Sequence, residues 1–161
     1  MSLLTSSGIH ADLSGVKVER GDLKWLDQRK PAAVAVFCFS DVRPLCGVAG
    51  FLDWRLCGAI SRRIETGDFA GHVDEVLLLP SEGRLGRQLV FAFGLGTLAD
   101  CNRQVLSRVC REAYRVMRRA GVANPMFAAP SVHGGGQMEA EFVQSVADEL
   151  KGEIGGVLVE S

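Results

Sequence analysis

The stretch GAISRRIETGDFAG, residues 58–71, carries the strongest local signal in the chain. It predicts a helix that ends at a glycine and then turns. Leu52, Leu56, Ala59 and Ile60 fall on one helical face, and Gly67 is a typical stop signal. We therefore expect one helix from about residue 50 to residue 66, followed by a turn and a strand.

Apolar runs on both sides of this helix predict strands. SGVKVER (14–20) alternates like a half-buried strand, and AAVAVFCFS (32–40) is the continuous apolar run of a central strand. VDEVLLLP (73–80) and QLVFAFGLG (88–96) are joined by SEGRLGR, a polar turn with two glycines, and could pair as a hairpin. PMFAAPS (125–131) and GGVLVES (155–161) predict two shorter strands.

Two amphipathic helices complete the pattern, one over about residues 101–120 and one over residues 137–150. Strands that alternate with helices indicate an α/β fold, with a mixed, mostly parallel sheet flanked by helices on both faces. A chain of 161 residues is long enough to bury a core of its own. We expect one domain over residues 1–161, with residues 1–12 as a loosely ordered tail.

Composition narrows the classes of function. The 18 Lys and Arg balance the 19 Asp and Glu, so the net charge of −1 gives no global attraction to nucleic acid or to an acidic membrane. The five cysteines are odd in number and lack a C-x-x-C pair, which favours reduced thiols in the cytoplasm. We find neither a targeting signal nor a membrane-spanning stretch.

One glycine-rich loop could hold an anion. The segment AAPSVHGGGQMEAEF places three glycines between a predicted strand and a predicted helix, where backbone N–H groups could bind a phosphate. Glu139 and Glu141 in the first helical turn would repel that anion, and a simple flexible turn is the alternative. The candidate residues of this loop are Ser131, His133, Gly134, Gly135 and Gly136.

The remaining motifs predict no catalytic residue, metal or cofactor. The HGGG tetrapeptide lacks the G-x-S-x-G nucleophile motif that a serine hydrolase requires, and FGLG lacks the third glycine of a dinucleotide-binding fingerprint. The three histidines are far apart in sequence, and none has a second metal ligand three or four positions away. His133 is therefore more plausible as a loop residue than as a general base.

Two surface features are candidates for an interaction. Trp54 falls towards the polar side of its predicted helix, as expected at a subunit or domain contact or at the rim of the core. The helix over residues 101–120 carries a basic stripe opposite its apolar face, which could contact phosphates or an acidic partner or could simply be solvated. The stripe consists of Arg108, Arg111, Arg115, Arg118 and Arg119.

The sequence CGAISRRIETGDFAGHVDEVLLLP, followed by VFAFGLG, resembles the N-terminal domain of the leucyl aminopeptidase family, peptidase family M17. That domain has a G-x-L/I-S helix, a G-[DE]-F-x-G turn, a strand and a G-L-G turn in this order. CNRQVLSRVCREAYRVMRRAGV is similar to the helix that follows, so the resemblance extends from about Ala32 to Ser161. At Asp53-Trp54 the chain departs from the family, in which we expect a small residue after the aspartate.

The resemblance implies a macro-domain-like fold and a domain without catalytic residues. The two-metal aminopeptidase site of this family lies in a separate C-terminal domain, with motifs such as N-T-D-A-E-G-R that this sequence lacks. We therefore expect a stand-alone, non-catalytic, cytoplasmic relative that acts by protein contact, through self-association or as accessory to a separate M17-type catalytic subunit.

Two other functions stay open. Macro domains bind ADP-ribose, and here Asp41, Gly50 and the loop 131–136 occupy similar places, although the first loop lacks the expected asparagines. A small-molecule binding module is thus the alternative. Nucleic-acid contact through the arginine stripe is the third and least favoured function.

Overall fold

The computed structural model describes residues 9–13, 15–81, 88–133 and 136–160. These residues form one mixed, mostly parallel sheet with helices on both faces, which confirms the predicted fold class. The strands are β1 (Ile9–Leu13), β2 (Val16–Arg20), β3 (Ala33–Phe39), β4 (Val76–Pro80), β5 (Leu89–Gly96), β6 (Met126–Ala128) and β7 (Gly156–Val159). The helices are α1 (Leu23–Arg29), α2 (Gly47–Arg55), α3 (Ala59–Glu65), α4 (Arg103–Arg119) and α5 (Gln137–Leu150).

The strand order is β1-β2-β7-β6-β3-β5-β4. The five strands from β2 to β5 in this order run parallel to their neighbours, whereas β1 and β4 are antiparallel edge strands. The expected hairpin between β4 and β5 is confirmed by their antiparallel register. The apolar run of β3 is buried at every position, because this strand lies inside the sheet and is covered on both faces.

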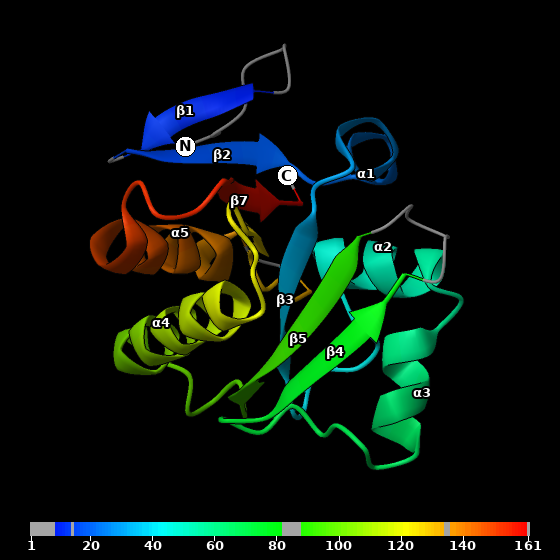
Figure 1. Ribbon diagram of the computed structural model, residues 1–161. Coiled ribbons are helices and arrows are strands. Elements are labelled where there is room, and N and C mark those ends of the chain that lie inside the picture. The colour runs from blue at the N-terminus through cyan, green and yellow to red at the C-terminus, as the bar shows by residue number, and fades with distance from the viewer. Residues whose placement is uncertain (1–8, 14, 82–87, 134–135, 161) are drawn as a thin grey trace.

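Two apolar cores cover the two faces of the sheet. Helices α4 and α5 lie on one face and α2 and α3 on the other, as Figure 1 shows. Phe37 of β3 is at the centre of the first core, with ring centroids of Phe93, Phe127 and Phe142 at 5.7, 5.4 and 4.8 Å. Because neighbouring residues of a strand point to opposite faces, the run 33–39 supplies both cores.

The prediction of one helix over residues 50–66 is wrong. The chain forms α2 and α3 instead, with a break at Cys57 and Gly58, whose φ angles of 55° and 76° lie in the left-handed region. Two successive residues there cannot continue a right-handed helix. Asp53 of α2 stabilises the restart, since its carboxylate accepts hydrogen bonds from the N–H groups of Ile60 and Ser61 at 2.8 and 3.1 Å.

The N-terminal region contains more structure than the sequence predicts. The expected loose tail over residues 1–12 is shortened, because residues 9–13 form β1; residues 1–8 lie outside the described part. Helix α1 was not predicted. It begins at an N-cap, Asp22, whose side chain accepts a hydrogen bond from the N–H of Trp25 at 2.8 Å.

The turn after α3 is held by one carboxylate. Glu75 Oε2 accepts hydrogen bonds from the backbone N–H groups of Ala70, Gly71 and His72 at 2.9, 2.7 and 3.0 Å. Burial alone would raise the pKa of Glu75, but these three donors bring the pKa below its ordinary value. This turn crosses so close to β5 that a Cβ atom on Gly94 would lie 1.8 Å from the carbonyl oxygen of His72.

Candidate functional site

The carboxyl ends of β3, β6 and β7 meet at one edge of the sheet, where open α/β folds bind their ligands. The chain places the candidate loop residues Ser131 and His133 there and brings Cys46 and Glu160, which the sequence analysis did not select, into contact with them. Ser131 Oγ donates a hydrogen bond to Glu160 Oε2 at 2.7 Å, and His133 Nε2 lies 3.4 Å from Cys46 Sγ. We call these four residues the carboxyl-edge cluster.

The cluster is acidic at its base. Glu139 of α5 is buried, and its carboxylate accepts a hydrogen bond from the N–H of Glu160 at 3.0 Å. Burial raises the pKa of Glu139; the hydrogen bond lowers it in part, and the nearby charge of Glu160 raises it further. Two carboxylates at the start of α5 disfavour a bound diphosphate by direct charge repulsion.

Cys46 and His133 have the separation of a nucleophile and a base. The thiol also donates a hydrogen bond to the carbonyl of Pro44 at 3.3 Å. Burial and the charge of Glu160 raise the pKa of Cys46, while the backbone of His133, not its imidazole, lowers it in part. The raised pKa favours the neutral thiol over the thiolate, which is the nucleophilic form of cysteine.

The other nucleotide-site candidates are used by the fold itself. The carboxylate of Asp41 accepts a hydrogen bond from the N–H of Leu98 at 2.9 Å. Gly50 lies inside α2, where a Cβ would come within 2.7 Å of the carbonyl oxygen of Leu45. Gly136 precedes the first residue of α5, and its carbonyl accepts from Ala140. Gly134 and Gly135 lie outside the described residues.

The N-terminus of α2, which faces the cluster, is closed by side chains. A Cβ on Gly47 would lie 2.6 Å from Ser131 Cβ and 3.2 Å from Glu160 Oε2. A carboxylate therefore already occupies the space near the positive end of this helix dipole. The arrangement leaves a phosphate group little room at the first loop.

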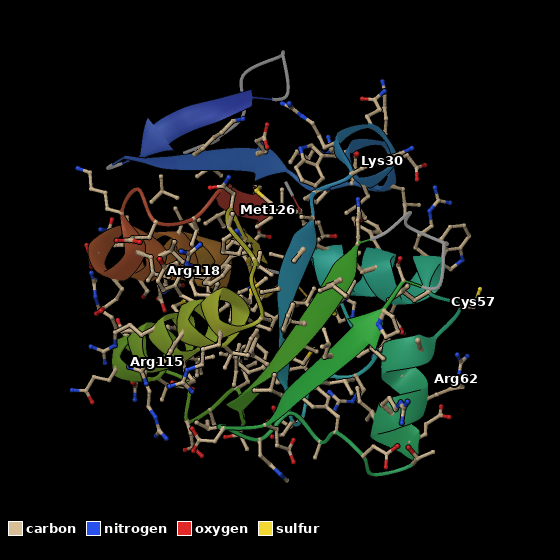
Figure 2. All side chains as sticks on the ribbon, in the orientation of Figure 1. Lys30, Cys57, Arg62, Arg115, Arg118 and Met126 are labelled. Atoms are coloured by element: carbon tan, nitrogen blue, oxygen red, sulfur yellow. The ribbon has the colours of Figure 1, made fainter. Side chains whose placement is uncertain are left out.

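The arginine stripe of α4 is largely paired within the chain. Arg108 donates to both carboxylate oxygens of Asp74 at 2.8 Å, and Arg118 donates to the carbonyl of Val122 at 3.2 Å. Arg111 and Arg115 lie 3.5 and 3.0 Å from Glu149 and Glu112. Arg119 is exposed and, among the described residues, has no ion-pair partner. Figure 2 shows Arg115 and Arg118 on the opposite side of the molecule from Cys57 and Arg62.

Trp54 is the most exposed large apolar side chain among the described residues, with 67% of its surface accessible. It lies at the rim of a hollow of about 670 Å³ between α2 and α3. Asp53 in the wall is committed to α3, and Arg55 is paired with Asp27. The lining residues are Pro44, Leu45, Gly50, Asp53, Trp54, Arg55, Cys57, Gly58 and Ser61.

No group of three or more His, Cys, Asp and Glu side chains is arranged to hold a metal ion in the described part of the chain. All five cysteines are free thiols. No described helix is long and apolar enough to span a bilayer.

Comparison with protein families identifies one match. The model of the cytosol aminopeptidase family, N-terminal domain, matches residues 33–152. This range extends from β3 to the end of α5. A search of curated proteins gives no match.

Solved structures with the same fold include a leucine aminopeptidase and several macrodomains. A tomato leucine aminopeptidase mutant superposes with a TM-score of 0.62 and 13% identity, over 89% of this chain and 32% of that chain. A macrodomain of Oceanobacillus iheyensis with ADP gives 0.60 and 13%, over 93% and 84%. The macrodomain of Mycobacterium tuberculosis DarG gives 0.61 and 14%, over 91% and 100%. These likenesses show the macrodomain-like fold. The chain spans about a third of the aminopeptidase it matches.

Proposed function

Because this chain belongs to the cytosol aminopeptidase family, as an N-terminal domain of that family, we propose that it acts without a catalytic site of its own, by binding another protein. The expected partner is a peptidase M17-type catalytic domain. A cytoplasmic location, which the reduced cysteines favour, belongs to the same proposal.

The observation that carries the proposal is the exposure of Trp54 beside its hollow. An indole left in water is costly, and tryptophan is among the residues that contribute most to binding at protein interfaces. Asp53 and the Nη2 atom of Arg55 already have partners inside the chain, so the surface offers mainly apolar contact area on a preformed frame. A contact with another domain would therefore bury the exposed apolar area around Trp54.

Calorimetric titration of the purified chain with a separately prepared M17-type catalytic domain tests the proposal. Trp54→Ala should weaken binding at least about 30-fold, the effect of an interface residue worth about 2 kcal/mol. Leu98→Ala is the matched control, because Leu98 is also exposed, at 37%, but lies outside the hollow. Absence of binding at about 100 µM, or equal binding by Trp54→Ala, would contradict the proposal.

The non-catalytic part has its own assay. The chain alone should give no peptide hydrolysis with added Mn²⁺ or Zn²⁺, because two-metal hydrolysis requires bridging carboxylates. Turnover that grows in proportion to the concentration of the chain would overturn this part, whatever the binding experiment shows.

A nucleotide-binding module is the second candidate, favoured by the fold shared with macrodomains. The carboxyl-edge cluster weighs against it, because Glu160 and Ser131 close the N-terminus of α2. We expect no change in melting temperature with ADP-ribose or ADP. A rise of several degrees would move the function to this edge, since a ligand that binds only the native state stabilises it. Nucleic-acid binding with a steep salt dependence would likewise favour the arginine stripe.

A further inference from the structure

Strand β4 is an open edge of the sheet. Among the described residues it pairs only with β5, on one side. Val76 and Leu78 expose 43% and 50% of their surfaces there. Proteins usually cover, charge or interrupt an apolar edge strand, because its free backbone groups can pair with another strand. An edge that carries exposed Val and Leu is therefore a candidate contact surface.

The backbone hydrogen bonds show which groups of β4 are free. Glu75 and Ser81 bond to β5, since Gly94 N–H donates to the carbonyl of Glu75 at 3.0 Å and Ser81 N–H donates to that of Gln88 at 3.2 Å. Residues of an antiparallel strand alternate in this respect. The N–H and C=O groups of Val76 and Leu78 consequently point away from β5. Pro80 also points away, but it has no N–H to donate.

The exposed side chains lie on the same face as α4. Val76 pairs with Phe93 and Leu78 with Phe91, and both phenylalanines belong to the core under α4 and α5. A hollow of about 420 Å³ separates Val76 from α4. Its rim carries charges of both signs, in the residues Asp74, Arg108, Arg111, Glu112 and Arg115.

We propose that two copies of this chain pair through β4, so that their sheets join across a twofold axis at Leu77. In this register Val76 of each copy lies opposite Leu78 of the other copy, which gives two equivalent pairs. The two outward residues of each copy then exchange about four backbone hydrogen bonds. Their apolar side chains form cross-strand pairs on the α4 face.

The rim and the strand length favour a second copy over another occupant. Each rim holds arginines and acidic residues together, so two identical rims can meet with opposite charges facing. A nucleic acid or a strongly acidic segment would need an excess of unpaired positive charge. Pro80 ends the stretch that can pair, which matches a short symmetric contact better than a long added strand.

Sedimentation at a series of concentrations measures the association. The interface is small, so we expect a dimer with a Kd of about 10 µM. Leu78→Lys should weaken it at least about 30-fold, because two lysines would enter the shared apolar strip. Trp54→Ala is the matched control: it should leave the dimer intact, just as Leu78→Lys should leave binding to the catalytic domain intact. The two variants therefore test the dimer contact at β4 and the contact with the catalytic domain at Trp54 separately.

Disulfide trapping tests the register and does not depend on how Leu78→Lys folds. Two Leu77→Cys residues would face each other in a non-hydrogen-bonded pair, about 4.5 Å apart at Cα, within disulfide range. In a Cys57→Ser background, which removes the exposed thiol, a mild oxidant should cross-link Leu77→Cys. Val76→Cys should not cross-link, because the copies of residue 76 are offset by two positions.

Three results would overturn the proposal. These are a monomer at all concentrations up to about 100 µM, a dimer that Leu78→Lys does not weaken, or cross-linking that is as efficient for Val76→Cys as for Leu77→Cys. Loss of the dimer in Leu78→Lys, together with preferential cross-linking of Leu77→Cys, would support the proposal.

Discussion

The carboxyl edge of the sheet differs from two exposed apolar surfaces, one at Trp54 and one on the α4 face of β4, in how its side chains are used. At the edge, Ser131, Glu139 and Glu160 bond to one another or to the backbone. In contrast, Trp54 and Leu78 each expose apolar area to solvent. In related folds the carboxyl edge is where ligands bind. Here its polar groups serve the fold, and the surface that remains available for binding is apolar.

This difference separates stability from binding. Changes at the internally packed and bonded positions should change the unfolding free energy, whereas changes at Trp54 or Leu78 should affect association and leave the unfolding free energy within about 0.5 kcal/mol.

Gly94→Ala should produce the largest loss. The added Cβ would collide with the backbone of the turn at His72, which cannot move away as a flexible side chain would. We expect a loss of more than about 3 kcal/mol in urea denaturation. Gly67→Ala is the control, because φ of Gly67 is +81° but no atom lies within 4 Å, so only about 1 kcal/mol should be lost. Equal losses would show that crowding at β5 is unimportant.

Asp53→Ala should cost about 2 kcal/mol. The substitution removes the acceptor for the first N–H groups of α3 and leaves them buried beside an apolar methyl group. Asp148→Ala removes an exposed partner of Arg103 and should change the unfolding free energy much less. If Asp53→Ala and Asp148→Ala have the same melting temperature, the hydrogen bonds that Asp53 accepts do not stabilise the start of α3.

Glu139→Gln should produce the smallest effect, and that effect depends on pH. The folded pKa of Glu139 is raised, so its contribution to stability is fully present below the unfolded pKa of about 4.3 and is lost as pH rises through the folded pKa. Glutamine keeps an acceptor for the N–H of Glu160 but cannot ionise. The melting temperature of Glu139→Gln at pH 7 should therefore exceed that of the unchanged chain by about 1–2 °C, and this difference should vanish near pH 4.

Exposed Glu141 is the control for the pH experiment. Glu141→Gln lies in the same helix turn but changes an acceptor of Gln137 on the surface. It should not reproduce the pH-dependent gain. A gain at pH 4 as large as at pH 7 would show that ionisation of Glu139 is not its cause.

Local patterns predicted most of the fold. The bounds of α5 coincide with the predicted range 137–150, because glycines and an apolar face mark that helix clearly. Helix α1 had a signal that was not used, namely the N-cap Asp22 and Pro31 after its end. The break between α2 and α3 had only a weak sequence signal, because Cys57 adopts a positive φ that cysteine residues rarely show.

The candidate site was less predictable than the fold. Cys46 and His133 are 87 positions apart and meet only because the loops after β3 and β6 share one edge of the sheet. Nothing in the local sequence of either residue signals this proximity. The same holds for Ser131 and Glu160, whose hydrogen bond depends on how the loop after β6 meets the end of β7.

The position of β7 has a consequence for synthesis. β7 lies between β2 and β6, and within the described residues β2 has no other link to the central strands. The β1-β2 hairpin therefore cannot join the central strands of this sheet until β7 has been translated. We expect the central strands of this domain to pair first and β1 and β2 to join the sheet last, once β7 can bridge them.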